Sequence, residues 1–551
     1  MKKIFLLIIA LVAIALVVVS CTNEEQSSSV GENNSVVESG FHQQESDNNQ
    51  TSTKENDQTN QTVESTDAQP ATDDQATEEA QTQAIIETNS IDTGTEQTQS
   101  EEPIITYSTK NDVQKKWSGK TLNVLTQRNV TSNNTSSGPA EQMELYTDYW
   151  GSTMVSAQEN RTAKIQELYG VTINWLQPTQ KNRLTHDIEI ARNVDGLYYE
   201  IAYPRGYDLF ALIGLVYDLN NREYIDFNNS YFSQDANKAF TVSGHTFFAD
   251  GDFNFVNEEI SFNILYNKTL LNEKYGIESL YNEVKNGTWT YDKFVSLIRS
   301  MYKDNGNGEV DDLDTYGFGT RDLYKFYRSF GIYGLSAKEK ERGYEITEKS
   351  DITKLNNVIR AILDLRTNSQ WAREFSGIDA IDSAFENGRL LFYSDFCQRT
   401  VTFTSESFSM GILPYPKLNQ EQDRYYTPIQ NAYLPIFMCI PKTTSDREMS
   451  DYFFDVLSWT GKEYVTAAYY DIKMSQFNES DRSENMDVLK NYVWNNIMYD
   501  PAELFFMSMF GGIEKKAVEK GYNDFENVYS TYEEGINVNL HSLNSNIDNE
   551  D

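Results

Sequence analysis

Short apolar runs alternate with amphipathic segments along most of this 551-residue chain. The run LNVLT, which starts at Leu122, suits a buried strand, and a second such run spans residues 171–176. A helical pattern over residues 154–168 lies between them and ends at Tyr169-Gly170, where the glycine stops the helix. The same order continues with a helix, a strand and a helix over residues 183–193, 201–203 and 209–217. Strands that alternate with helices form βαβ units, so the sequence predicts an α/β fold with parallel sheets.

The remainder of the chain carries further strand and helix signals. We expect strands over residues 247–255, 262–266, 390–396 and 433–440, and helices that open at Asn267-Lys268 and span residues 353–366 and 378–387. From Asp446 onward the pattern is mainly helical. A chain of this length predicts two or more domains, and no internal repeat is visible in the sequence.

The N-terminus has the features of an export signal. Lys2 and Lys3 precede an apolar run from Ile4 to Val19, which leads into Ser20-Cys21. A charged region, an apolar region and a small residue are typical of a signal peptide, here residues 1–20, and a retained N-terminal anchor is the alternative. The cysteine that follows resembles a bacterial lipobox, which implies cleavage before Cys21 and a lipid on its thiol. In both cases we expect the rest of the chain outside the cytoplasmic membrane and tethered to it.

A polar tract follows this signal. From Thr22 to about Pro103 nearly every residue is Asn, Gln, Ser, Thr, Glu or Asp. Such a segment buries too little apolar surface to offset the chain entropy lost on folding. We therefore expect residues 21–115 to be a lipid-anchored, disordered acidic stalk and residues 116–551 to be the folded part. The net charge of −37 makes nucleic acids and anionic membrane surfaces poor partners for the chain.

Histidine and cysteine offer little for catalysis. The chain has four histidines, His42, His186, His245 and His541. Their spacing matches no metal site, and no GxSxG or HExxH motif accompanies them, so structural roles are expected. Apart from Cys21, the cysteines are Cys397 and Cys439, both in apolar, strand-like runs. Two buried thiols and a disulfide both suit an extracytoplasmic location, and both stay open.

Residues 286–318 join a capped helix to an acidic loop. Thr290 is well placed as the N-cap, with Asp292 in the first turn, where a carboxylate interacts favourably with the helix dipole. Trp289 precedes the cap and can pack on Phe294 as a hydrophobic staple. Apolar residues then recur at helical spacing and predict one buried stripe, formed by Phe294, Leu297, Ile298 and Met301.

The loop after this helix alternates oxygen-bearing side chains with Gly306 and Gly308. Its candidate ligands for a hard cation such as Ca²⁺ are Asn305, Asn307, Glu309, Asp311 and Asp314. In the frame of an EF-hand loop, the first ligand position falls on Lys303, and the twelfth holds an aspartate where a bidentate glutamate is usual. A turn of Gly, Asn and Asp residues that keeps its form without metal is therefore the alternative to a structural calcium site.

The tryptophan-capped helix, the GNG-type loop and the DTYGF run that ends at Phe318 resemble the extracellular solute-binding proteins of family 1, the maltose-binding-protein-like receptors of ABC importers. The loop is one residue shorter than the D-x-NGDG run frequent in that family. The runs RTAKIQELYGVTINWL and YEIAYPRGYDLFALIGLVYDLN resemble the first lobe of these receptors, and YNK at residues 266–268 resembles the segment after the first crossing between lobes. Residues 384–389 and 410–416 resemble segments near the return crossing.

This resemblance implies a two-lobed α/β fold of the type II periplasmic-binding-protein kind, in which crossing segments form a hinge. It places a first lobe at about residues 120–255 and a second lobe at about residues 263–425. A C-terminal helical part over residues 441–551 would pack on both lobes. The resemblance also implies an oligosaccharide as ligand, an ABC permease as partner and a monomeric receptor.

Ligand-binding residues in an open α/β sheet lie beyond the carboxyl ends of the strands. Sugars present hydroxyl groups at their rim and C–H groups on their faces, so a sugar site combines charged hydrogen-bonding groups with flat aromatic rings. The charged candidates are Arg128, Arg205, Asp252 and Asp395, and the aromatic candidates are Trp150, Tyr203, Trp371 and Tyr415. The alternative for the aromatic residues is core packing, and for Asp252 a solvated turn.

The expected function is that of a lipid-anchored receptor on the extracytoplasmic face of the membrane, which binds an oligosaccharide by hinge closure and breaks no bond. No catalytic residue and no cofactor other than calcium is expected. The same acids could instead form the carboxylate pair of a glycosidase. A cell-surface adhesin, a sensor's binding module and a receptor for peptides are further alternatives.

Overall fold

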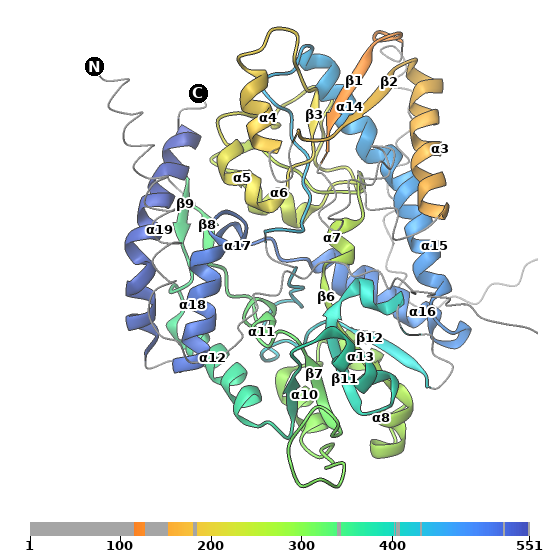
Figure 1. Cartoon of the computed structure of the whole chain (residues 1–551), viewed down its shortest axis with the longest axis vertical. Coiled ribbons are helices and arrows are strands. Elements are labelled where there is room, and N and C mark those ends of the chain that lie inside the picture. The colour runs from red at the N-terminus through yellow and green to blue at the C-terminus, as the bar shows by residue number, and fades with distance from the viewer. Residues whose placement is uncertain are drawn as a thin grey trace, which may run out of the picture. The chain divides into compact units, whose positions relative to one another are not determined.

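Two separate α/β sheets organise the part of the chain that the computed structural model describes (Figure 1). The described residues are 115–126, 152–179, 184–338, 343–401, 403, 408–429, 432–521 and 524–548, all of which lie in one compact unit. The expected signal peptide, Cys21 and most of the stalk fall outside them. None of the helices in these ranges is long and apolar enough to span a membrane.

The first sheet contains three parallel strands, β1 (Thr121–Leu125), β2 (Thr172–Leu176) and β3 (Ile201–Ala202), in the order β2-β1-β3. A segment that returns from much later in the chain, Ile436–Ile440, extends it beyond β3. The backbones of Ala202 and Cys439 exchange hydrogen bonds of 2.9 and 3.0 Å in an antiparallel bridge. On its other side the returning segment pairs with Ala249, through bonds of 3.0 and 2.8 Å to Met438.

The second sheet has five strands in the order β10-β7-β11-β6-β12. Its strands are β6 (Phe262–Asn267), β7 (Tyr316–Thr320), β10 (Ala372–Glu374), β11 (Leu390–Phe396) and β12 (Met410–Leu413). β10, β7 and β11 are parallel to one another, whereas β6 is antiparallel to both β11 and β12. β6 is the first strand after the chain leaves the first sheet.

The two sheets have the same strand order. In each one, the second, first and third strands of the lobe are followed by an antiparallel segment that has just arrived from the other lobe, and then by a later part of the same lobe, which is β12 in the second sheet and the single bridged residue Ala249 in the first. That arriving segment is Ile436–Ile440 in the first sheet and β6 in the second. The order of strands confirms the two-lobed α/β fold with crossing segments that we expected from the sequence.

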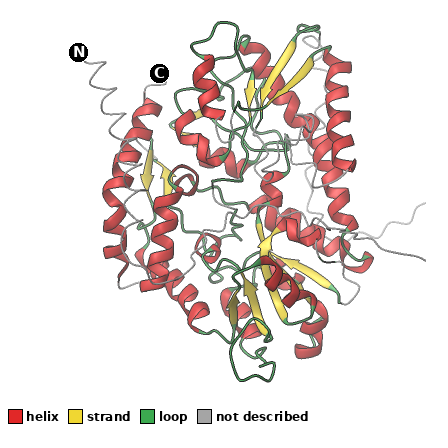
Figure 2. Cartoon of the chain, in the orientation of Figure 1, coloured by secondary structure: helices red, strands yellow, loops and turns green. Residues whose placement is uncertain are grey.

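Both faces of each sheet are covered by helices, as Figure 2 shows by colour. On the first sheet, α3 (Ser152–Tyr169) and α14 (Arg447–Thr460) cover the face of Leu122 and Val124, and α4 (Leu184–Ala191) and α5 (Gly206–Leu212) share a core with Leu125 and Ala202. Strands buried on both faces read as continuous apolar runs, which is why they stand out in the sequence. The remaining small elements of this lobe are α6 (Gln234–Phe240), β4 (Thr241–Val242) and β5 (His245–Thr246).

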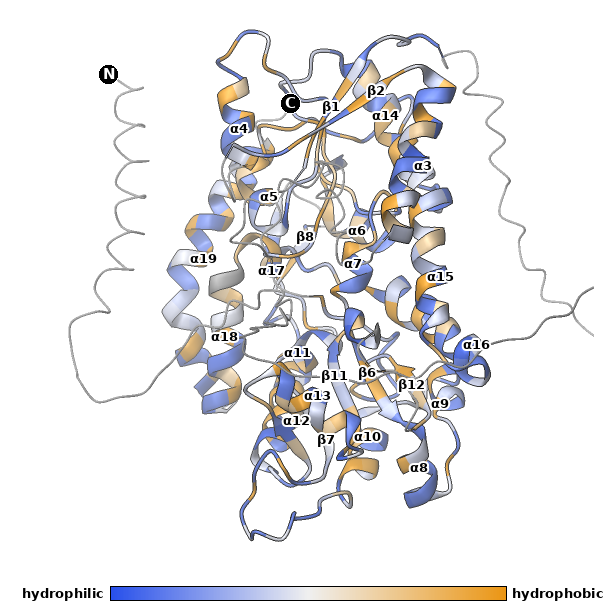
Figure 3. Ribbon diagram, turned by 45° about the vertical axis from the view of Figure 1, so that its right-hand side comes forward, coloured by the Kyte–Doolittle hydropathy of each residue, from blue (hydrophilic) through white to orange (hydrophobic). Residues whose placement is uncertain are grey.

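The second sheet also has two apolar faces. Phe392 belongs to the same core as α10 (Tyr291–Ile298), whereas Tyr393, the next residue of β11 and therefore on the opposite face, lies in the core of α13 (Ile378–Glu386). Further elements of this lobe are α8 (Lys268–Tyr275), α9 (Tyr281–Lys285), α11 (Lys325–Ser329), α12 (Ile352–Thr367), β8 (Leu335–Ala337) and β9 (Tyr344–Ile346). Outer helices such as α12 carry hydrophobic residues on one side and hydrophilic residues on the other (Figure 3).

The C-terminal part of the chain is helical. Its helices after α14 are α15 (Ala467–Ser475), α16 (Glu479–Val488), α17 (Pro501–Phe505), α18 (Met507–Lys520) and α19 (Phe525–Asp548). α14 contributes Phe453 and Leu457 to the core of the first lobe, and α15 and α16 contribute Tyr469 and Met486 to a core of the second. This region therefore contacts both lobes.

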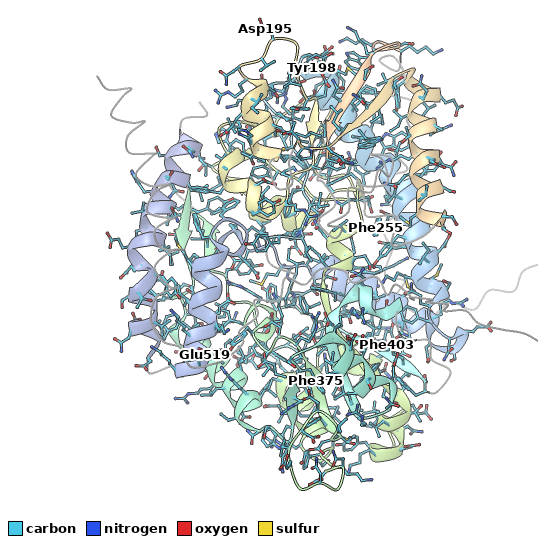
Figure 4. The ribbon with its side chains drawn as sticks, viewed as in Figure 1. Asp195, Tyr198, Phe255, Phe375, Phe403 and Glu519 are labelled. Carbon is cyan, nitrogen blue, oxygen red and sulfur yellow. The ribbon has the colours of Figure 1, made fainter. Side chains whose placement is uncertain are left out.

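Three segments connect the lobes. The first runs over residues 250–261 and contains the short helix α7 (Val256–Glu259), and the second runs over residues 427–435. The third is helical and passes from α14 to α15 through a π-helical turn, Gly461–Thr466. The first and third meet where the ring of Phe255, labelled in Figure 4, stacks on Tyr469 with centroids 5.0 Å apart.

The capped helix predicted from residues 286–318 is present as α10. The Trp289–Phe294 staple is confirmed: the ring centroids lie 6.0 Å apart, and the indole Nε1 donates to the Pro414 carbonyl at 2.9 Å. The stripe of apolar residues is buried. Thr290 occupies the N-cap position, but the prediction that its side chain caps the helix is wrong, because that side chain makes no capping hydrogen bond. The backbone here pairs with Lys417 instead, in a parallel bridge.

Three other local predictions differ from the structure. Residues 247–255 do not form a strand; Ala249 and Gly251 form single antiparallel bridges, with Met438 and Phe232, and the backbone of Gly251 lies against Tyr231. The helix expected over residues 209–217 is α5, which begins earlier, at Gly206, where the Asp208 carboxylate accepts from the backbone amide of the N-cap residue Arg205 at 3.1 Å. Pairing of the strand expected over residues 433–440 begins only at Ile436. Cys397 and Cys439 are free, buried thiols.

Candidate functional site at the strand ends

The carboxyl ends of the strands in both lobes lie where the crossing segments enter. β6 runs antiparallel to β11, so its first residues, Phe262 and Asn263, pair with the last residues of β11, Phe396 and Asp395. In the first lobe the returning segment begins beside the end of β3, where Ile436 pairs with Arg205. Ligands of open α/β sheets bind beyond such ends, so these two edges form the candidate site.

An ion pair marks the edge of the second lobe. Arg321, directly after β7, donates from Nε and Nη2 to the two carboxylate oxygens of Asp395, at 2.7 and 2.9 Å. The backbone amide of Phe396 also donates to this carboxylate, at 2.8 Å. Asp395 is buried, whereas 24% of the Arg321 side chain is exposed. A bidentate pair of this kind is rigid, and its guanidinium presents a fixed set of donors.

A second cation and an aromatic pair lie close to this ion pair. Lys325 of α11 donates to the carbonyl of Ile429 in the second crossing segment, at 3.3 Å. Its Nζ lies 5.0 Å from the ring centroid of Phe262, and that ring packs on Phe396 with centroids 4.7 Å apart. These contacts connect the edge of the second lobe to the hinge.

Arg205 marks the edge of the first lobe. It is buried, its backbone amide donates to the Asp208 carboxylate at 3.1 Å, and its guanidinium donates to the carbonyl of Tyr433. Burial lowers the pKa of Arg205 to about 10. Tyr203 is fully buried between Trp175 and Phe253, at ring distances of 6.2 and 5.0 Å. Core packing, the alternative given for the aromatic residues, therefore describes its position in this structure.

Tyr433 presents an exposed aromatic ring at this edge, which the sequence patterns did not indicate. Tyr433 is 52% exposed and lies 5.7 Å, centroid to centroid, from the ring of Tyr207 in α5. The sequence placed it in a buried strand. Pro435 was the signal against that placement, because proline cannot take part in the hydrogen bonding of a central strand.

Three carboxyl groups gather in the first crossing segment, on Asp250, Asp252 and Glu258. Asp250 accepts hydrogen bonds from the Asn257 amide, at 2.8 Å, and from the Tyr499 hydroxyl. Burial raises the pKa of Asp250 to about 6, raises that of Asp252 to about 7, and holds that of Glu258 well above its usual range. Burial in the first crossing segment therefore favours the protonated forms of these carboxyl groups.

The remaining candidates lie elsewhere. Trp371 precedes the start of β10, at the edge of the sheet opposite the carboxyl ends, where Arg299 lies 4.8 Å over its ring. Tyr415 is near Asp395 but fully buried, with its hydroxyl bonded to Ser394 and its ring 4.9 Å from Phe326. Arg128 and Trp150 lie outside the described residues. The structure therefore places Arg205, Asp252 and Asp395 at the crossings and separates Trp371 from them.

The acidic loop is held by its own amide groups. Asp314 accepts from the backbone of Asn305 at 2.9 Å and of Asp311 at 3.2 Å, and Asn307 donates to Asp311 at 2.7 Å. In the described part of the chain no group of three acidic, histidine or cysteine side chains is arranged to hold a metal ion. Calcium binding and a metal-free turn both stay predictions for this loop.

No protein-family model matches the sequence, and no curated protein matches it. Many solved structures are similar in fold. One is a family 1 extracellular solute-binding protein from Bifidobacterium longum subsp. infantis, with 13% identity, coverage of 77% of this chain and 98% of that chain, and a TM-score of 0.46. It carries the name of the family that the sequence motifs resemble.

Two further solved structures are named for sugar ligands. A maltose/maltodextrin-binding domain from Bdellovibrio bacteriovorus, bound to maltotriose, is 12% identical, covers 76% of this chain and all of its own, and has a TM-score of 0.42. A cyclo/maltodextrin-binding protein complexed with maltotetraose is 12% identical, covers 76% of this chain and 97% of its own, and has a TM-score of 0.49.

Proposed function

We propose that this protein is the lipid-anchored, extracytoplasmic substrate-binding protein of an ABC importer and that it binds an oligosaccharide between its two lobes. One observation carries the proposal: both sheets have the same strand order and each includes a segment arriving from the other lobe. The carboxyl ends of both sets of strands therefore lie at the hinge, where a solute can contact both lobes at once.

The groups at these ends suit a polyhydroxylated ligand. The Arg321–Asp395 pair offers directional donors beside a carboxylate, and Tyr433 offers an exposed aromatic face. A solute that contacts both lobes stabilises the closed arrangement, which the permease would recognise. No bond of the solute is broken in this mechanism, so it requires neither a nucleophile nor a general base.

The N-terminal sequence supports the location. A signal peptide over residues 1–20 and a lipid on Cys21 would hold the protein at the outer face of the cytoplasmic membrane, with the polar tract as a stalk. From that position the folded part would deliver solute to the transmembrane subunits of the permease as a monomer.

A thermal-shift screen of the purified protein against linear and cyclic oligosaccharides tests the proposal, with chromatography of each sugar after incubation. Ligand binding to the folded state stabilises it by RT ln(1 + L/Kd), where L is the free ligand concentration, so the melting temperature rises with the logarithm of the ligand concentration once this exceeds Kd. A shift with intact sugar supports a receptor. A shift with cleaved sugar would instead indicate a glycosidase, and no shift with any sugar would favour a peptide receptor or an adhesin.

A further inference from the structure

The side-chain amide of Asn263 has no hydrogen-bond partner in the described part of the chain. Asn263 is the second residue of β6 and is 1% exposed, and neither its Oδ1 nor its Nδ2 is bonded. Roughly nine in ten buried polar groups in folded proteins are paired, and a buried amide with both ends unpaired has lost its bonds to water without replacement. The position therefore calls for a partner that the described residues do not supply.

Two other buried asparagines have partners for their side-chain amides. Asn485 of α16 is equally buried, and its amide donates to the Met410 carbonyl and accepts from the Ile412 amide, both at 3.1 Å. Asn257, in the first crossing segment, donates to Asp250 and to the Ile436 carbonyl, at 2.8 and 2.9 Å. Asn237 and Asn254 are also buried, and each has one amide atom unpaired, so Asn263 differs from the other buried asparagines of the described residues in that both of its amide atoms lack a partner.

That position lies within the candidate site. Asn263 is the register partner of Asp395 in the antiparallel β6–β11 pair, and such partners point to the same face of the sheet with Cβ atoms about 5 Å apart. Asp395 directs its oxygens to Arg321 and to the Phe396 amide, not to the neighbouring Asn263. Arg321 is the member of this group that reaches solvent.

We propose that Asn263 is a ligand-binding residue that, beside the Arg321–Asp395 pair, forms a subsite for two adjacent hydroxyl groups of the solute. A primary amide is both donor and acceptor, so it can donate through Nδ2 to one hydroxyl oxygen and accept through Oδ1 from the next. A vicinal diol matches this pattern. The inference rests on the proposed function and narrows the substrate class to solutes with such a diol.

The burial of Asn263 has a consequence for the order of events. Because its side chain is 1% exposed in this arrangement, a solute reaches it only when Arg321 or the lobes move. Hinge opening is a movement of this kind, and closure then buries the amide together with its new partners. The alternative occupant is an ordered water molecule, which could satisfy the same two atoms in every state.

Replacement of Asn263 by leucine tests whether the partner of the amide is the solute or a water molecule. Leucine is close in size to asparagine and has no polar group. We expect Asn263→Leu to melt at or above the wild-type temperature without sugar, since it removes an unpaired amide. Asn485→Leu is the matched control and should melt lower, because it leaves the Met410 carbonyl and the Ile412 amide without partners. Asn263→Ala is the second variant, to be used if the leucine side chain does not fit at position 263.

Binding is then measured by titration calorimetry with maltotriose, xylotriose and raffinose, and with monodeoxy analogues of whichever sugar binds. The proposal expects the Asn263 variants to bind roughly tenfold to a hundredfold more weakly than wild type. It also expects one monodeoxy analogue to lose affinity for wild type and not for the variants. Wild-type affinity in both variants would overturn it and favour the water molecule. If wild type binds none of the sugars, the proposed function fails and the inference fails with it.

Discussion

The guanidinium of Arg328 lies 2.5 Å from the carboxylate of Asp500, and both side chains are buried. Arg328 belongs to α11 in the second lobe, whereas Asp500 is the N-cap of α17. The same guanidinium pairs with Glu514 of α18, and the Tyr327 hydroxyl donates to the nearby Glu348 at 2.8 Å. One buried cation thus attaches the C-terminal helices to the second lobe.

Removal of that cation should be strongly destabilising. Arg328→Met leaves Asp500 and Glu514 buried without their partner, and breaking a buried pair from one side costs about 3–5 kcal/mol. Urea unfolding followed by tryptophan fluorescence measures the loss. Lys349→Met is the control, because its pair with Glu526 lies at the surface, with 30% and 70% of the two side chains exposed, and surface pairs contribute only about 0–1 kcal/mol. Equal losses in the two variants would contradict this role of Arg328.

The stability of the protein should fall as the pH rises towards neutral. Burial raises the pKa of Glu348 from 4.5 to about 7. Between these pH values the folded protein retains a proton that the unfolded chain has released. The contribution of this retained proton to the free energy of unfolding is therefore fully present below pH 4.5. It decreases by up to about 1.4 kcal/mol per pH unit as the pH rises to 7.

Glu348→Gln should flatten this pH dependence, whereas Glu345→Gln, on an exposed residue of β9, should leave it unchanged. Free energies of unfolding from urea titrations across the same pH range provide the measurement. Burial also raises the pKa of Asp252 to about 7, so part of the slope should survive in Glu348→Gln. A slope identical to that of wild type would show that Glu348 ionises normally in the folded protein.

Two helical glycines should respond in opposite ways to alanine. A Cβ at Gly461, where the helical crossing passes the first crossing segment, would lie 2.1 Å from the carbonyl oxygen of Asp252. Gly461→Ala should therefore cost about 1–3 kcal/mol through forced backbone displacement. At Gly511 in α18 a Cβ meets no atom within 4 Å, so Gly511→Ala should stabilise by up to about 1 kcal/mol. The melting temperatures of the two variants, each compared with wild type, test these opposite expectations.

Tyr433 should contribute to sugar binding without contributing much to stability. Its ring is half-exposed, and Tyr433→Ala should weaken the affinity for a bound oligosaccharide by roughly fivefold to tenfold through loss of the aromatic face. Tyr198→Ala is the control, because that residue lies in the loop after α4, distant from the crossings (Figure 4). Calorimetric titration would contradict the role of Tyr433 if both variants bound alike.

The effect of calcium on the melting temperature distinguishes a calcium site in the acidic loop from a metal-free turn. If the loop holds the ion through Asp311 and its neighbours, calcium restored to chelated protein should raise the melting temperature of wild type and not of Asp311→Asn. If the loop is a metal-free turn, calcium should change neither, and Asp311→Asn should melt lower because Asn307 loses a charged acceptor.

The sequence predicts the periodic elements well and the pairing between distant segments poorly. α3, β2, β6 and β11 lie within about two residues of the expected ranges, because two covered faces or one apolar stripe leave a strong pattern. The two lobes have matching strand orders, but no repeat is visible in the sequence. A buried strand requires only that its residues be apolar, and many different apolar residues meet this requirement.

In the candidate site, too, some residues are indicated by the sequence pattern and others are not. Asp395 follows the recognisable strand LLFYS, whereas its partner Arg321 follows YGFGT, in which two glycines lower the strand signal. Gly317 is required there because a Cβ would lie 2.4 Å from Ile298 of α10. Asn263 carries no signal of its own in the sequence, because only the three-dimensional surroundings reveal that its amide lacks a partner.

The exchange of segments between the sheets has a consequence for biogenesis. The first sheet lacks its antiparallel member until residues 436–440 have been synthesised, although β1 is made long before. Folding of the earlier residues alone would leave the edge of β3 uncovered, so nearly the whole chain should be present before the first lobe reaches its final fold. A truncation before residue 436 would thus yield an aggregation-prone fragment rather than a folded first lobe.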